Sequence, residues 1–187
     1  MSNRNISENL KKVLRACEDD FKCTARASRE ELIKTLEPGQ PAPSEGVIYG
    51  DEFKKGYKKR TEGYQADIAE ILDKHVADLK KKATEAPSVE AVSSISLLNM
   101  RTNITRQEVE DLLERYGDNP QAYNTISNIA RNHDIQGIGS HPISEAAANA
   151  EGLRDTLIKA IDHRSGGLSS GKCAFIEMSI DSLFPAE

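Results

Sequence analysis

The chain has 187 residues, of which 37% are hydrophobic and 29% charged, enough for one ordinary domain or a domain with a helical extension. Lys and Arg number 25 against 30 Asp and Glu. The formal net charge of -5 argues against a protein whose whole surface binds a polyanion. The sequence shows no apolar run near the ~20 residues that cross a bilayer and no signal-peptide core at its N-terminus. We therefore expect a soluble, intracellular protein.

The cysteines Cys17, Cys23 and Cys173 are odd in number, which argues against a disulfide framework. The sequence has no Cys-x-x-Cys pair and no spaced Cys/His quartet, so it does not predict a zinc site. We expect reduced thiols, no metal and no cofactor.

Residues 1–37 are expected to form an amphipathic helix, because Leu10, Leu14, Cys17 and Phe21 recur at spacings of three and four. Ser28, followed by Glu31, is a capping-box pattern. The helix is therefore expected either to restart or to bend near residue 28. Residues 38–50 contain three prolines without a period and predict an extended linker.

Residues 51–83 predict a long charged helix, with apolar residues mostly three, four or seven apart. Its first half is unusual, because Gly56-Tyr57 and Gly63-Tyr64 repeat one heptad apart. A glycine inside a helix costs about 1 kcal/mol. Either the glycines admit close approach of a partner helix, or the helix starts later, near Thr61.

Residues 84–187 are expected to form a small helical domain with a C-terminal tail. Ser88 is the predicted N-cap of its first helix. The predicted apolar stripe of that helix is Val89, Val92, Ile95 and Leu98.

A helical hairpin follows. Thr105-Arg106-Gln107-Glu108 is a capping box, and Gly117 is expected to close the helix. Asn119-Pro120 predicts the start of the second helix, because proline is favoured at the first helical position behind an Asn cap. A glycine-punctuated loop at 135–142 then leads into a helix that begins at Ser144.

The C-terminal piece from Cys173 fits two patterns, since Ile176, Met178 and Ile180 alternate as in a strand while other spacings fit a helix. We favour the helix, because the chain offers no second strand for pairing. The glycine-rich stretch 166–172 lacks the preceding strand and the Ser/Thr after the lysine that a phosphate loop needs. It is interpreted as a turn. The expected fold class is all-α, with long N-terminal helices forming a hairpin or arm plus a small helical module.

The most unusual local composition is basic. The five cations Lys54, Lys55, Lys58, Lys59 and Arg60 surround Tyr57, a mixture that can neutralise phosphates and stack a base. Residues 51–82, however, hold nine cations and seven anions, so the carboxylates cancel most of the positive field. We favour a solvated or protein-facing helix over a nucleic-acid site.

The same helix carries apolar residues that need cover, and Tyr57, Tyr64, Ile68 and Ile71 are candidates for a partner interface. We expect either oligomerisation through this face or docking of the N-terminal helix onto it. Together with the five cations, these residues form the predicted partner-binding set.

Catalytic signals are weak. The pairs His133-Asp134 and Asp162-His163 are adjacent in sequence, but adjacent residues on a helix point about 100° apart and do not form a dyad. His75 and His141 complete the four histidines. The expected protein is not an enzyme.

One stretch carries a resemblance. It runs through Leu97–Thr105, Glu108, Val109, Leu112, Tyr116–Ala122, Ile126, Ile129–Ala130 and Ile135. This pattern resembles uncharacterised proteins of phages and prophages of Gram-positive bacteria. The resemblance implies a component of the virion-structural gene cassette, located in the host cytoplasm or the virion, and it assigns no functional residue.

Three hypotheses follow. The first is a non-enzymatic helical structural or assembly protein, encoded by a phage, that associates with itself or with a larger protein partner. The second is an inhibitor encoded by a mobile element that blocks a host nucleic-acid enzyme, as anti-defence and anti-CRISPR proteins do. The third is an unrecognised hydrolase.

Overall fold

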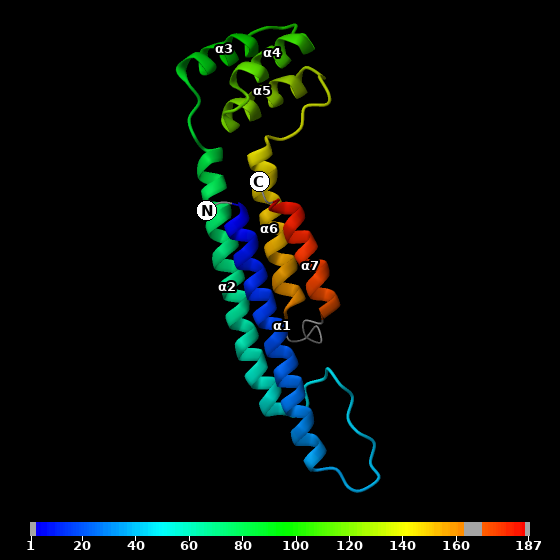
Figure 1. The fold of residues 1–187 in the computed structure, drawn as a ribbon. Coiled ribbons are helices and arrows are strands. Elements are labelled where there is room, and N and C mark those ends of the chain that lie inside the picture. Colours follow the sequence, from blue (N-terminus) through cyan, green and yellow to red (C-terminus); the bar gives the residue numbers. More distant parts are fainter. Residues whose placement is uncertain (1–2, 163–169, 186–187) are drawn as a thin grey trace. The chain divides into compact units, whose positions relative to one another are not determined.

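The computed structural model describes residues 3–162 and 170–185, and every regular element in these ranges is an α-helix (Figure 1). The helices are α1 (Asn3–Lys34), α2 (Asp51–Ala83), α3 (Val89–Asn99), α4 (Arg106–Tyr116), α5 (Pro120–Asn132), α6 (Pro142–Ala160) and α7 (Ser170–Leu183). The all-α prediction, with long N-terminal helices and a small helical module, is confirmed. The helical prediction for the C-terminal piece is confirmed too, whereas residues 163–169, with His163 and most of the expected glycine-rich turn, lie outside the described residues.

The chain divides into two compact units. The first, here called the bundle unit, comprises residues 1–74 and 151–187, and the second, the insert unit, comprises residues 75–150. Both boundaries fall inside helices, namely α2 and α6. The stretch 84–187, expected as one domain, is therefore shared between the units, and the second half of α6 and α7 pack with the N-terminal helices.

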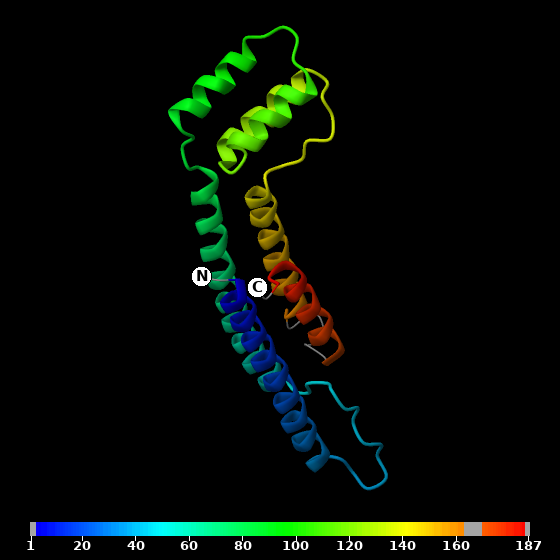
Figure 2. The ribbon, with the colours of Figure 1, turned by 45° about the horizontal axis from the view of Figure 1, so that its top comes forward.

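The bundle unit is held together by an apolar core to which α1, α2, α6 and α7 all contribute (Figures 1 and 2). The core members are Ile6, Leu10, Leu14 and Cys17 from α1, Ile68 and Leu72 from α2, Leu153, Leu157 and Ile161 from α6 and its end, and Cys173, Ile176, Ile180 and Phe184 from α7 and its end. The three-four spacing of α1 predicted its buried stripe correctly. Ion pairs at the edge of this core join α1 to α7, between Lys11 and Asp181 and between Arg15 and Glu177.

Helix α1 runs without interruption through Ser28, so of the two predicted alternatives, a restart or a bend, the restart is wrong. Ser28 is buried and its hydroxyl donates to the Ala25 carbonyl at 2.9 Å and accepts from the Tyr49 amide at 3.1 Å. Arg29 donates from Nε to the Pro43 carbonyl at 3.0 Å. The serine pattern thus marks the point where the non-helical connection 38–50 is fastened to α1, rather than a helix start.

Helix α2 begins at Asp51, so the alternative of a later start near Thr61 is wrong. The space around its two glycines, Gly56 and Gly63, is largely open. A Cβ at Gly56 would come to 3.4 Å from the Arg60 guanidinium, and one at Gly63 would have nothing within 4 Å. Within the described residues, neither glycine serves a close approach between helices.

The insert unit packs α3, α4 and α5 around a small core of its own. The buried members are Ile95, Leu98, Val109, Ala122, Ile126, Ile129 and Ala130. The predicted caps are confirmed: the Ser88 hydroxyl accepts from the Ala91 amide, Thr105 and Glu108 form the reciprocal capping box, and Asn119 caps α5 with Pro120 behind it. Helix α6 starts earlier than predicted, because His141 Nδ1 accepts from the Ile143 amide at 3.1 Å.

The predicted apolar stripe of α3 is wrong at two positions. Ala91, Ile95 and Leu98 face the core, whereas Val89 is 85% and Val92 49% exposed. The sequence carries apolar residues on both sides of this short helix, so spacing alone did not decide which side packs inward. The helix therefore presents an apolar face away from its own core.

Gly63→Ala is expected to raise the free energy of unfolding by about 0.5 to 1 kcal/mol, because alanine loses less backbone entropy in a helix and meets no neighbour here. Gly46→Ala is the matched control, since Gly46 also has open space around it but holds φ at +71°. That variant is expected to lose stability. Urea unfolding of both variants measures the two signs, and a destabilised Gly63→Ala would contradict the prediction.

A pH dependence is expected from the capping box. The Glu108 carboxylate accepts from the Thr105 amide and hydroxyl, both at 2.9 Å, and pairs with Arg101. These contacts, the amide first, lower the pKa of Glu108 below its ordinary value of 4.5. A lowered folded-state pKa contributes stability that is present above pH 4.5 and is lost as the pH falls through the lowered pKa.

The stability difference between the wild type and Glu108→Gln should therefore be positive at neutral pH and shrink below pH 4.5. Urea unfolding across this range measures the difference. A gap between the two proteins that stayed constant down to pH 3 would show that the carboxylate contributes no pH-dependent stability.

Candidate functional site

The apolar residues of the predicted partner-binding set lie against α1. Tyr57 and Ile68 are only 2% and 0% exposed, and the Tyr57 ring packs on Phe21 at a centroid distance of 5.7 Å. Tyr64 and Ile71 are half-buried against the same core. We expected either oligomerisation or the N-terminal helix to cover this face. The structure shows the N-terminal helix docked on it, so much of the face is buried within the chain.

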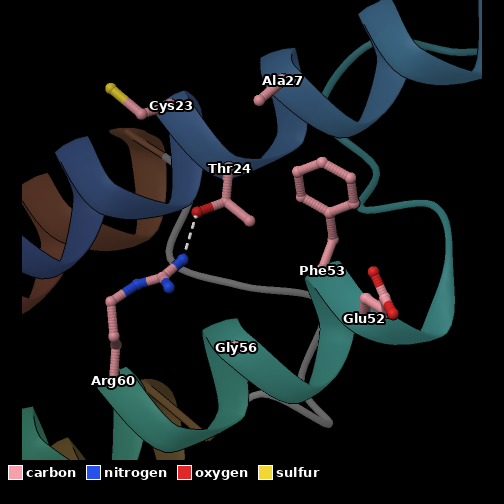
Figure 3. A pocket seen from close by; sticks show the side chains of 7 residues that line it. All are labelled: Cys23, Thr24, Ala27, Glu52, Phe53, Gly56 and Arg60. Carbon is pink, nitrogen blue, oxygen red and sulfur yellow. Dashed lines mark hydrogen bonds between the residues drawn. The ribbon is translucent and has the colours of Figure 1, made fainter.

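The basic residues divide into two groups. Lys54, Lys55, Lys58 and Lys59 are exposed on α2. Arg60 instead turns toward α1, where its Nε lies 2.8 and 2.9 Å from the Asp20 carboxylate oxygens. Its Nη2 donates to the Thr24 hydroxyl at 2.7 Å, the bond drawn in Figure 3. The predicted cluster of five cations is thus a cluster of four exposed lysines beside an arginine that links two helices.

A cavity of about 430 Å³ lies between α1 and α2 next to Arg60. Figure 3 shows Phe53 reaching from α2 toward Ala27, with Gly56 beneath the space and the Cys23 sulfur pointing away from it. The Arg60 charge, which faces this cavity, is already balanced by Asp20. The cavity thus combines the apolar side chains of Phe53 and Ala27 with the Glu52 carboxylate and one cation that is already paired.

The buried thiols are unreactive by environment. Burial raises the pKa of Cys17 to about 11. For Cys173, burial is the larger cause and a hydrogen bond with Glu18 the second, and they raise its pKa to about 12. Both therefore stay protonated near neutral pH, and the thiol form is a poor nucleophile and metal ligand. All three cysteines are free; Cys17 and Cys173 are core residues of the bundle unit, whereas Cys23 is exposed.

The histidines are placed by local structure. His141 is 7% exposed, caps the start of α6 and packs edge-on against Tyr123 at 5.2 Å. His133 is the C-cap of α5. Burial lowers the pKa of His75 in α2. Across residues 3–162 and 170–185, His, Cys, Asp and Glu side chains form no group of three that could hold a metal ion.

The surface that sequence reasoning missed lies on α7. Phe175 and Met178 are 72% and 71% exposed, on the side of the helix opposite its buried residues Ile176 and Ile180. Beside Phe175 an open groove of about 430 Å³ runs between α6 and α7, lined by Leu153, Thr156, Leu157, Ala160, Gly171, Lys172, Phe175, Ile176 and Ser179. Apolar residues at 175, 176, 178 and 180 could have signalled two apolar faces, once the segment was taken as a helix.

Comparison with protein-family models, with curated proteins and with solved structures yields no match for this chain. None of the helices in the described ranges combines the length and apolar character needed to cross a membrane. The candidate site is therefore assigned from its geometry alone, as a pair of surfaces: the exposed lysines of α2 and the apolar outer face of α7.

The four exposed lysines are expected not to bind DNA, because carboxylates interleave with them and Lys58 lies 3.9 Å from Glu62. A mobility-shift titration at low salt tests this. Micromolar affinity that fell with salt at a slope near -0.9 per phosphate neutralised, and that disappeared when Lys54, Lys55, Lys58 and Lys59 were replaced by glutamine, would contradict the prediction.

Proposed function

We propose that this protein is a non-enzymatic helical structural or assembly protein, encoded by a phage, that acts by contact with copies of itself or with a larger protein. The observation that carries the proposal is the outer face of α7, where two large apolar side chains stand in solvent next to an apolar groove. The resemblance of residues 97–135 to proteins of the virion-structural cassette supports the phage assignment.

The outer face of α7 is favoured because the helix is already anchored from its inner side. Ile176 and Ile180 are buried, and Glu177 and Asp181 pair with Arg15 and Lys11 of α1. The packing of the bundle unit therefore does not depend on the side chains of Phe175 and Met178. A large aromatic and a methionine side by side are typical of the central residues of protein interfaces.

The groove adds shape to this surface. Its walls come from Leu153, Leu157 and Ala160 on α6 and from Phe175 on α7, so an apolar side chain of a partner that enters the groove would be removed from water. Burial of apolar surface is the main driving force of such association, at roughly 25 cal/mol per Å². The exposed lysines lie on α2 rather than α7. They would select a partner by its charge and contribute little to the affinity.

The proposal predicts concentration-dependent self-association that depends on α7. Phe175→Glu with Met178→Glu should lower the average mass of the protein in sedimentation equilibrium at about 100 µM, because each charge would have to be buried in the contact. The melting temperature should change little, since both side chains are exposed.

Ala16→Glu with Ala66→Glu is the matched control, which adds the same two charges at exposed positions of α1 and α2. The control should associate like the wild type. A wild type that remains a monomer throughout this concentration range, or a double α7 variant with unchanged mass, would contradict self-association through this face.

A further inference from the structure

Helix α3 presents an outward face without any charged residue. Its members are Val89, Val92, Ser93, Ser96, Leu97 and the C-cap residue Met100, all of them exposed. At 100° per residue they fall within an arc of about 140°. Val89, Leu97 and Met100 are 85%, 65% and 82% exposed, so three large apolar side chains of one short helix lie mostly in solvent.

The two serines do not make this face polar. The Ser93 hydroxyl donates to the Val89 carbonyl at 2.9 Å, and the Ser96 hydroxyl donates to the Val92 carbonyl at 2.7 Å. Each donor is therefore satisfied within the helix. What remains at the centre of the face is a pair of small side chains flanked by larger apolar ones, which lets another helix approach closely.

The order of residues on the face reads the same in both directions. Around the midpoint between residues 94 and 95, Val89 mirrors Met100, Val92 mirrors Leu97 and Ser93 mirrors Ser96. A two-fold contact requires a surface that is complementary to itself. In an antiparallel pair about this midpoint, Val89 meets Met100 of the second copy, while Leu97 and Val92 each lie over a serine of the other helix.

Charge at the ends of the face selects the same arrangement. Glu90 lies in the first turn, and Arg101, which pairs with Glu108 of its own chain and keeps 57% of its side chain exposed, follows the last. Antiparallel pairing brings Glu90 of one copy close to Arg101 of the other at both ends, whereas parallel pairing would set like charges side by side. Such peripheral pairs contribute mainly to orientation and specificity.

We propose that the α3 face is a homotypic interface, where two copies of this chain pair antiparallel about a two-fold axis at residues 94–95. The proposal rests on the proposed assembly function, but it uses a helix of the insert unit, whereas the α7 face belongs to the bundle unit. A pair of three-turn helices is small, so the contact is weak alone and gains strength where many copies assemble.

Cysteine cross-linking tests the geometry. In the Cys23→Ser background, which removes the exposed thiol, Val89→Cys and Met100→Cys proteins are mixed at about 100 µM and oxidised. A disulfide-linked dimer is expected in the mixture and not with Val89→Cys alone. Dimers of Val89→Cys with itself would indicate a parallel pair, and no dimer in the mixture would mean that α3 is not a homotypic interface; either result overturns the proposal.

The affinity is tested separately with Val92→Glu plus Leu97→Glu, which should weaken pairing at least tenfold, because charges would have to enter the contact. Thr125→Glu plus Asn128→Glu, at exposed positions of α5, is the matched control and should pair like the wild type. Equal pairing by both variants would overturn the proposal.

Repeating the cross-linking in the Phe175→Glu, Met178→Glu background separates the two hypotheses. In one outcome, the α3 cross-link still forms in this background and the Phe175→Glu, Met178→Glu variant has the same average mass as the wild type. The proposed α7 contact then fails and the α3 inference stands. If the α7 variant lowers the mass but no α3 cross-link forms in either background, the α3 inference alone fails.

Discussion

Burial of the apolar stripe of α1 is the constraint on which the bundle unit depends. Leu10, Leu14 and Cys17 are fully buried, and a single helix cannot cover them. Their cover comes from α2, which follows directly in the chain, and from the second half of α6 and α7, which follow only after the insert unit. The core therefore closes through contacts between residues more than a hundred positions apart, such as the pair of Arg15 and Glu177. Contacts this distant carry a large loop-closure cost before they stabilise anything, so the bundle unit is expected to complete late in folding.

Much of the fold could be read from local signals. The caps at Ser88, Thr105 and Asn119 each depend on a hydrogen bond from an amide three residues onward, so both partners can be read from the local sequence. Ser28 carried the same pattern but accepts from the amide of Tyr49, 21 residues onward. A capping residue inside an amphipathic stripe thus has two possible partners, and tertiary contact decides between them.

The candidate interfaces were harder to predict, because periodicity identifies apolar faces but not which face is inside. On α2 the sequence showed an apolar stripe in need of cover, and α1 supplied it, so the four apolar residues of the predicted partner-binding set are buried or half-buried within the chain. On α3 and α7 the opposite occurred. Each is short, has apolar residues on two sides and buries only one, so Val89 and Phe175 are left in solvent. Which side packs is fixed by the neighbouring helices, and those positions are not encoded in the local pattern.

The two exposed faces together bear on how the protein could work. One belongs to each compact unit. A chain with one self-complementary surface forms a closed pair, and growth stops there. A chain with a second contact surface on its other unit, as proposed for the α7 face, offers a free surface after each contact is made, so every added copy exposes a new site. Weak single contacts then combine into a stable assembly, because dissociation of a copy held at both faces requires both to open. This arrangement needs no buried charge and no strong individual interface, which agrees with outward faces on α3 and α7 that are small and apolar.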